Sequence, residues 1–207
     1  LNITNPNSTL EAQNANFSAN YGENGLLQSL NASSGDIQAS GDFGVLQTQG
    51  QSSLDLSYHD NGNLEQLETS LGQVHFENPN GETLEITDGA AQMTFNEEGF
   101  LEGMTGNAEH LQWSNNDGSS LDAQGMNMNI VMGENGMLQS ADASSGALTY
   151  TNAFGTLNTQ GNSSVQMTCN DNGTITQLNL NSDDAHFVSS SDDVHALGGA
   201  AQLNFSE

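Results

Sequence analysis

GVLQTQGQSSLDLSYHDNGNLEQL, residues 44–67, is the stretch that decides the fold of this chain. Apolar and polar residues alternate up to an Asp-Asn-Gly turn, and a second strand-like stretch follows the turn. Asn-Gly between two alternating stretches is the strongest short-range signal of a β-hairpin, and it is typical of a type I′ turn. The stretch therefore predicts two antiparallel strands with one apolar face and one polar face.

The same pattern returns at a numbering offset of 111, so that residue 44 corresponds to residue 155. Residues 155–178, GTLNTQGNSSVQMTCNDNGTITQL, match residues 44–67 at 12 of 24 positions, and residues 119–146 match residues 8–35 at 16 of 28. The chain is therefore an internal duplication of 8–110 and 119–207. Gly-rich junctions recur at regular intervals within each copy, near Gly35, Gly72, Ala108, Gly146 and Asp183. We expect one continuous domain, 1–207, of about six units of 37 residues.

The periodicity favours an all-β fold. No segment keeps the i, i+3, i+4, i+7 spacing of an amphipathic helix, and Gly or Asn-Gly interrupts nearly every window. Hairpins at this frequency make the sheet antiparallel. We predict an antiparallel repeat meander that folds into an open-edged β-jellyroll with two facing sheets and no significant helix.

The charge balance excludes several functions. The 207 residues include 26 Asp plus Glu and no Lys or Arg, which gives a formal net charge of −26. Nucleic acid is therefore not an expected partner, because phosphates find no basic side chain except His. Lysine Schiff bases, arginine fingers and P-loop lysines are impossible. A single cysteine, Cys169, excludes an internal disulfide.

Residues 39–76, ASGDFGVLQTQGQSSLDLSYHDNGNLEQLETSLGQVHF, resemble the repeats of the OstA/LptA/LptC-like lipopolysaccharide-transport β-jellyrolls. Residues 120–150 follow the same order of strand, Gly-containing hairpin and Ala-x-x-Gly junction. The resemblance implies an open-edged folded sheet in the periplasm that stacks end to end and holds acyl chains in its apolar fold. It implies lipid or lipopolysaccharide as a ligand.

Two sets of residues are candidate sites on this reading. Apolar positions of the alternating stretches are predicted to line the ligand groove: Leu54, Leu56, Phe95, Trp113, Met128, Ile130, Met167 and Phe205. Residues near the two ends of the chain are predicted to form the assembly edges, which would pair head to tail with a second copy: Leu10, Phe17, Leu203 and Phe205.

No motif predicts catalysis. The five histidines show no zinc-protease spacing, and neighbouring carboxylates such as Asp183 and Asp184 are expected by chance in so acidic a chain. Cys169 lies in an apolar strand position with no cation to lower its pKa, so it is interpreted as an inert thiol. We predict no catalytic residues, no cofactor and no dedicated metal site, although divalent cations could bind loosely to carboxylates.

These observations leave two main functional hypotheses, beside a third, a carbohydrate-active enzyme, for which the sequence shows no readable active site. The first is a non-enzymatic β-jellyroll protein of the cell envelope or extracellular space, with an apolar groove and open edges for end-to-end assembly. The alternative is a self-assembling structural filament subunit with no lipid ligand. On either hypothesis we expect a periplasmic or secreted protein whose signal peptide has been removed.

Overall fold

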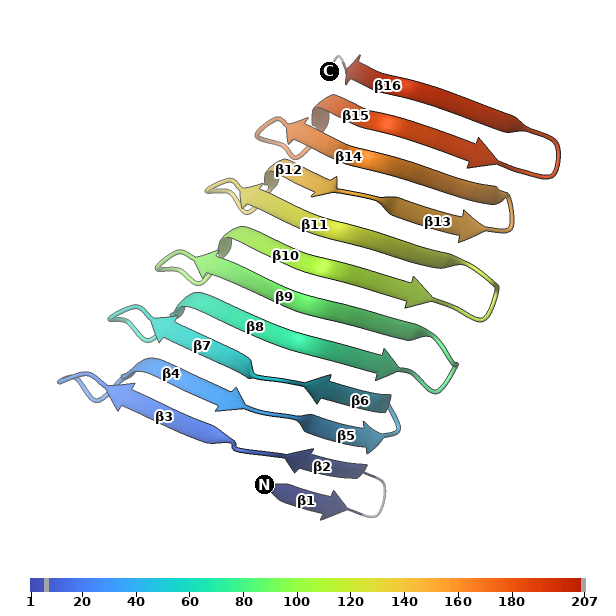
Figure 1. Ribbon diagram of the computed structural model, residues 1–207. Helices are drawn as coiled ribbons and strands as arrows, with labels where there is room; N and C mark the ends of the chain where they lie inside the picture. The colour runs from blue at the N-terminus through green and yellow to red at the C-terminus, as the bar shows by residue number, and fades with distance from the viewer. Residues whose placement is uncertain (6–7, 206–207) are drawn as a thin grey trace.

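A computed structural model describes residues 1–5 and 8–205, and these residues form one sheet of sixteen strands (Figure 1). Every strand pair is antiparallel, which confirms the all-β antiparallel meander. The described residues contain no helix that could cross a membrane. The strands are β1 (Asn2–Asn5), β2 (Ser8–Ala12), β3 (Asn16–Tyr21), β4 (Leu27–Ser34), β5 (Ile37–Gly41), β6 (Gly44–Gln49), β7 (Ser52–Tyr58), β8 (Leu64–Glu77), β9 (Thr83–Phe95), β10 (Leu101–Ser114), β11 (Ser120–Met132), β12 (Leu138–Ser145), β13 (Leu148–Asn152), β14 (Gly155–Cys169), β15 (Ile175–Val188) and β16 (Asp193–Asn204).

The strands stack in chain order, so the two termini lie at opposite ends of the sheet (Figure 1). Strands β8, β9, β10, β11, β14, β15 and β16 are 12 to 15 residues long. The shorter strands fill the same positions in pairs: β6 and β7, for example, both pair with β8. From β2 and β3 onward the sheet is therefore about as wide as one long strand, and β1 extends it in one half alone.

A line of residues with positive φ crosses the middle of the sheet. These residues recur at regular intervals, within or between the strands that run toward the Asn-Gly turns: Asn14, Gly50, Asp88, Gly125, Gly161 and Gly198. We call them the bend line. Arm A is the part of the sheet between the bend line and the turns that contain Gly25, Gly62, Gly99, Gly136 and Gly173, and it includes β3, β4, β7 and β12. Arm B is the opposite part, including β1, β2, β5, β6 and β13.

In most strands the apolar phase shifts by one residue at the bend line. β14 is an exception, because the register shift between Gln160 and Ser163 keeps its apolar positions odd-numbered in both arms. In β9 the apolar positions are Leu84 and Ile86 in arm B, but Ala91 and Met93 in arm A. The register with β10 is unchanged across this shift, because Ile86 pairs with Leu111 and Ala91 with Gly106. A left-handed residue re-aims the side chains that follow it, as in a β-bulge. The bend line therefore lets the apolar residues of both arms face the same side of the sheet.

The Asn-Gly turns form hairpins, but not type I′ turns. In the first turn only Gly25 has positive φ, and the backbone N–H of Gly25 donates to the carbonyl oxygen of Gly22. The N–H of Gly22 in turn bonds to the carbonyl of Leu26, which leaves a loop of three residues with a left-handed glycine at its end. The predicted turn type is therefore wrong, because the side-chain oxygen of Asn24 accepts from the N–H of Leu26 and holds the asparagine in a turn of its own.

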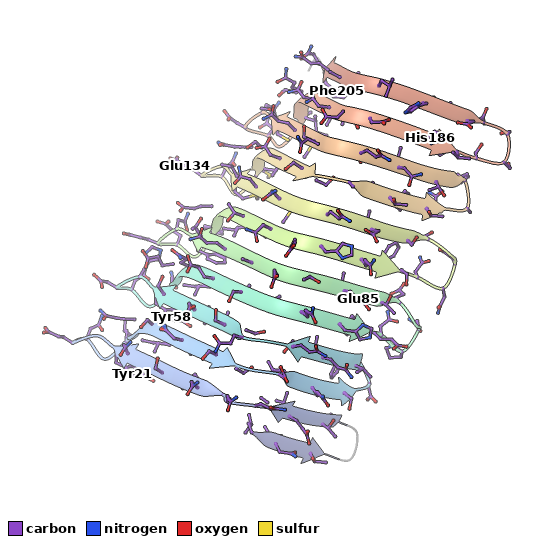
Figure 2. All side chains as sticks on the ribbon, in the orientation of Figure 1. Tyr21, Tyr58, Glu85, Glu134, His186 and Phe205 are labelled. Atoms are coloured by element: carbon purple, nitrogen blue, oxygen red, sulfur yellow. The ribbon has the colours of Figure 1, made fainter. Side chains whose placement is uncertain are left out.

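The interior of the molecule is thin. Among the described residues the only buried apolar side chain is that of Ala123, next to the bend line, and the buried polar residues Thr48, Ser52, Ser145 and Thr159 lie along the same line. The solvent-accessible surface is 12554 Å², whereas a globular protein of this mass exposes about 9,300 Å². Side chains project from the ribbon without a second layer of strands over them (Figure 2). The strands thus form one bent sheet, and they do not close into two sheets around a shared core.

Candidate functional site: the apolar face of the sheet

Rows of apolar side chains cross arm A from strand to strand. Directly opposed residues in an antiparallel sheet share a face, so the strand registers define each row. One row consists of Leu30, Leu56, Leu67, Met93, Met104, Ile130, Ala141, Met167, Leu178 and Leu203. The row is continuous from β4 to β16. It gives the sheet an apolar face about ten strands long.

Arm B carries matching rows on its own apolar phase. The row through the predicted groove residue Trp113 consists of Leu10, Ala39, Leu46, Phe76, Leu84, Trp113, Leu121, Tyr150, Leu157, Phe187 and Val194. It runs from β2 to β16 and shares the long strands β8, β9, β10, β11, β14, β15 and β16 with the row in arm A. Apolar side chains therefore accompany the bend line on both sides.

The structure distributes the predicted groove residues over this face and does not gather them at one point. Leu56, Ile130 and Met167 lie in the row just described for arm A. Leu54 and Met128 belong to the next row toward the bend line, in which Met128 pairs with Gly106 and Ala143. The two phenylalanines lie near the Asn-Gly turns, with Phe95 opposite Leu101 and Phe205 just beyond β16. The period-2 alternation in the sequence thus predicted which residues share the apolar face, but it did not locate a pocket.

A hollow of about 500 Å³ lies on this face near the C-terminal end of the sheet. Apolar residues of both arms line it, together with small polar residues at the bend line. The apolar lining residues are Met126, Ala143, Leu148, Leu157, Val165, Leu180, Ala185, Ala200 and Ala201. Because residues of both arms line one hollow, the apolar face is the concave side of the bend.

The sequence analysis missed all of these lining residues. The signal that could have identified them is the size of cross-strand partners. Ala143 lies opposite Met128 and Val165, and Ala201 lies opposite Leu180, so small side chains flank the large pair Val165 and Leu180 in this row. The hollow occurs where alanine, serine and glycine leave space between leucine and valine. The side chains that border it stay partly exposed, with Val165 at 44% and Leu180 at 37%.

The predicted assembly edges need one correction. Leu10 is not at an edge, because it lies in β2 between β1 and β5 and pairs with Ile3 and Ala39. The strand β1, which the sequence analysis did not anticipate, covers that side of β2. In the described residues, Phe17 lies in β3, which pairs only with β4, and Leu203 lies in β16, which pairs only with β15. The backbone N–H of Phe205 still bonds to Thr176 on β15.

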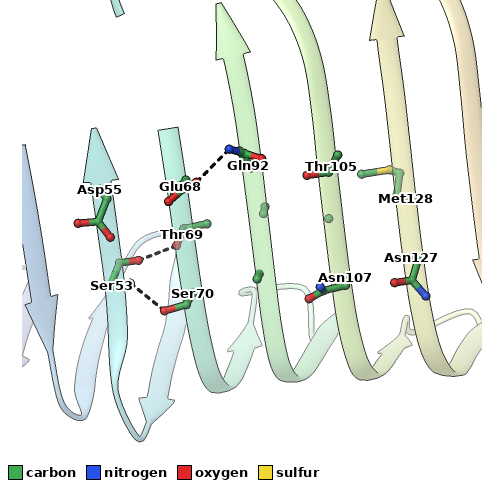
Figure 3. A pocket seen from close by; sticks show the side chains of 13 residues that line it. Ser53, Asp55, Glu68, Thr69, Ser70, Gln92, Thr105, Asn107, Asn127 and Met128 are labelled. Atoms are coloured by element: carbon green, nitrogen blue, oxygen red, sulfur yellow. Dashed lines mark hydrogen bonds between the residues drawn. The ribbon is translucent and has the colours of Figure 1, made fainter. Parts of the chain in front are cut away.

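The opposite, convex face is polar. A shallow depression of about 400 Å³ in arm A is bordered mainly by hydroxyl, amide and carboxylate side chains, together with alanines and Met128 (Figure 3). The hydroxyls of Ser53 and Ser70 are 2.8 Å apart, and Gln92 Nε2 donates to Glu68 Oε1 at 2.9 Å. Asp55 lies directly opposite Glu68, which places two carboxylates side by side. In this depression the polar side chains of neighbouring strands hydrogen-bond to one another.

Four of the five histidines contact carboxylates on the polar face of arm B. The pairs are His75 with Glu85 at 3.1 Å, His110 with Asp122 at 3.0 Å, His186 with Asp193 at 2.6 Å, and His195 with Asp184 at 2.7 Å. The repeat equivalents His75 and His186 occupy similar strand positions with different acidic partners. Within residues 1–5 and 8–205, no group of three or more metal-ligating side chains is arranged to hold a metal ion.

Two carboxyl groups have a lowered pKa. Gln112 Nε2 donates to Asp122 Oδ2 at 2.6 Å, and His110 bonds to the other oxygen, so both interactions favour the ionised form and lower the pKa of Asp122. The hydroxyl and backbone N–H of Ser119 lower the pKa of Asp117 in the turn between β10 and β11. Both effects come from local hydrogen bonds, within one turn for Asp117 and between the adjacent strands β10 and β11 for Asp122.

Comparison of the chain with protein-family models, with curated proteins and with solved structures finds no match.

Proposed function

We propose that this chain is a non-enzymatic lipid-handling protein of the periplasm or extracellular space, which holds an acyl chain against the concave apolar face of its sheet. The observation that carries the proposal is the hollow near Val165 and Leu180, whose lining is apolar and whose side chains remain partly exposed. Covering exposed apolar surface lowers the free energy by roughly 25 cal/mol per Å². A flexible acyl chain can lie along the bend line and cover it.

The charge of the molecule restricts the headgroup of such a ligand. With a net charge of −26 and no Lys or Arg, the chain repels anionic headgroups and offers them no basic partner. An uncharged or zwitterionic lipid avoids this cost. Phosphorylated lipopolysaccharide, which the resemblance in repeat pattern implies, would need divalent cations between its phosphates and the carboxylates of the protein.

The test is binding of lysophosphatidylcholine with a fluorescent acyl chain. We expect its fluorescence to rise on addition of the protein. The variant Ala143→Phe fills the hollow from the internal strand β12 and should weaken binding at least tenfold. The matched control is Ala90→Phe, which adds the same side chain to the convex polar face in β9 and should bind like wild type. Absence of binding, or equal effects of both variants, would contradict the proposal.

A second candidate function is a structural subunit that assembles through its sheet edges and has no lipid ligand. The observation in its favour is β16, all of whose twelve residues are exposed. Electron microscopy of lipid-free protein at increasing concentration separates the two functions. Long regular assemblies that bind no fluorescent lipid would support the structural role.

A further inference from the structure

Strand β16 at the C-terminal end of the sheet is an unprotected edge. Its twelve residues are all exposed, and in the described part of the chain it pairs only with β15. Soluble proteins usually protect such edges with lysine, proline, charge or a covering segment. β16 contains no lysine or proline, and Asp193 at its first position is its only carboxylate. An edge of this length is a template for pairing with another strand.

The directions of the strands argue against a head-to-tail partner. Ten antiparallel steps separate β3 from β16, so the two strands run the same way. Copies related by translation would place β16 beside β3 in a parallel pair, in a sheet whose other pairs are all antiparallel. β1 has the opposite direction, but it has only four residues and lies in arm B. Head-to-tail stacking would therefore leave half of β16 unpaired.

A two-fold rotation gives β16 an antiparallel partner of equal length, namely β16 of a second copy. In the register that places Gly198 opposite Gly199, apolar residues lie opposite apolar residues and polar residues lie opposite polar residues. On the apolar face Val194 meets Leu203 and Ala196 meets Ala201. On the polar face the pairs are Asp193 with Asn204, His195 with Gln202, and Leu197 with Ala200. No carboxylate of β16 opposes another carboxylate in this arrangement.

The backbone hydrogen bonds fit the same register. The N–H of Phe205 donates to Thr176 on β15, and residues of an antiparallel strand alternate in the direction of their N–H groups. In arm A the N–H groups of Ala200, Gln202 and Asn204 therefore point to the free edge. For arm B we compare β16 with β11, in which Gln124 precedes the bend residue Gly125 as Leu197 precedes Gly198. The N–H of Gln124 points away from the preceding strand β10 and donates to Ala147. By this repeat equivalence Asp193, His195 and Leu197 also present free N–H groups, and the register pairs them with the three residues of arm A.

The two central glycines permit this approach. A Cβ added to Gly198 or Gly199 would meet no atom within 4 Å, so the backbone at the centre of the edge is open. Glycine inside a strand often marks a place where another backbone comes close. Gly199, Ala200 and Ala201 also line the apolar hollow. A second copy would place its own Gly199 to Ala201 across the axis and continue the hollow into its own sheet.

We propose that the protein forms a two-fold dimer through β16, in the register that pairs Gly198 with Gly199, and that the dimer joins two sheets into one continuous concave apolar face. The contact is isologous, so it closes at two copies and does not propagate as a filament. This dimer does not depend on the proposed lipid ligand, because the pairing of the edge strands requires only the protein.

The first experiment measures the mass of the lipid-free protein by sedimentation at increasing concentration. Wild type should be a dimer at micromolar concentration. Ala200→Pro removes an N–H at the free edge while leaving the bonds to β15, so it should weaken dimerisation at least tenfold. A wild-type protein that stays monomeric at hundreds of micromolar, or that forms open-ended assemblies, would overturn the proposal.

The second experiment tests the register itself. In a Cys169→Ser background, Ala196→Cys and Ala201→Cys lie on the same strand of one chain, so they cannot bond to each other within it. In the proposed dimer each faces the other across the two-fold axis at a non-hydrogen-bonded pair, where Cβ atoms are close enough for a disulfide. Oxidation should give a covalent dimer in more than half of the protein. Head-to-tail stacking would place β3 of the next copy beside Ala201, and no Ala196 would face it, so only the two-fold pairing brings the two cysteines together. Absence of the cross-link would therefore contradict the register even if the protein were dimeric.

Discussion

The asparagines of the turns each hold two neighbours in place. Asn24, Asn61 and Asn135 accept a backbone N–H two residues ahead within their own turn. Their side-chain amides also donate to a carbonyl oxygen 36 residues ahead, in the next turn along the sheet: Asp60, Glu97 and Asp171. The corresponding position of the third turn is Glu98, which has no amide to donate. These asparagines therefore connect three pairs of successive turns, and Asn63 adds a second hydrogen bond to the carbonyl oxygen of Glu97.

Substitution of Asn135 separates these two contacts. Asn135→Asp keeps the oxygen that accepts from Met137 but loses the amide that donates to Asp171, whereas Asn135→Ala loses both. Because the site is exposed, each hydrogen bond should contribute about 0.5 to 1 kcal/mol to the free energy of unfolding. Urea denaturation should rank stability as wild type, then Asp, then Ala. Equal stability of all three proteins would show that the ties between turns are not energetically significant.

Asp122 gives a pH dependence of defined sign. Its pKa is lowered by Gln112 and then by His110, so the folded state favours the ionised form. The stabilisation is present at pH values above the ordinary pKa of 3.8 and is lost as the pH falls through the lower pKa of the folded state. We expect wild type to lose stability relative to Asp122→Asn between about pH 4 and pH 2. Melting temperatures of both proteins over this range measure the effect, and parallel curves would contradict it.

At the scale of the strand, the bend line decides which way side chains point. Five of its six residues are glycine or asparagine, the residues that adopt positive φ at least cost, and the exception is Asp88 with φ of 46°. Without this left-handed residue, a long strand such as β9 would place the apolar residues of its two arms on opposite faces. The concave apolar face therefore depends on one residue per pair of strands.

Adding a side chain at one bend position and removing one at another should change the free energy of unfolding differently. Gly125→Ala places a Cβ at φ of 60°, where the nearest atom is 3.8 Å away, so the cost is backbone strain alone. We expect a loss of about 1 kcal/mol in the free energy of unfolding. Asp88→Gly removes strain at the equivalent position and should cost less than Gly125→Ala or raise stability. Chemical denaturation of the two variants gives the comparison, and a larger loss for Asp88→Gly would contradict this account of the bend.

The two faces of a strand should differ in their tolerance of charge. Ile130 lies in the apolar row of arm A, and Asn129 is its neighbour on the polar face of β11. Ile130→Asp should destabilise the protein by about 1 to 3 kcal/mol, because it places a carboxylate among Met104 and Ala141. Asn129→Asp should change stability by less than about 0.5 kcal/mol. Equal losses for both would show that the period-2 assignment of faces is wrong.

At the scale of the whole molecule, two quantities stand out. The surface of 12554 Å² is about a third larger than expected for 21.8 kDa. The net charge is −26, and in the described residues the amino terminus and any protonated histidines are the positive groups that oppose the carboxylates. The first quantity leaves much apolar area for a ligand or a second copy to cover. The second makes self-repulsion a destabilising contribution throughout the sheet.

Salt should therefore stabilise the protein. The Debye length falls from about 30 Å at 0.01 M to about 8 Å at 0.15 M ionic strength, so repulsion between distant carboxylates is screened over this range. We expect the melting temperature at pH 7 to rise by several degrees, with most of the rise below about 0.2 M NaCl. A rise that occurs only at molar concentrations would instead reflect exclusion of the salt from the protein surface. A melting temperature independent of salt would contradict the electrostatic account.

The sequence alone determined the antiparallel meander, because period-2 alternation and Asn-Gly turns are local signals that act over a few residues. It also identified Leu56, Ile130 and Met167 as members of one face. It did not determine the depth of the hollow, which depends on the size of cross-strand partners such as Ala143 and Val165. Only the tertiary structure paired β1 with the strand of Leu10 and, in the described residues, left β16 with β15 as its one partner, since edges depend on pairing between strands and not on local signals. The positive φ of the bend-line residues was also visible only in the tertiary structure. Aspartate, as at position 88, is a weaker local signal for positive φ than glycine.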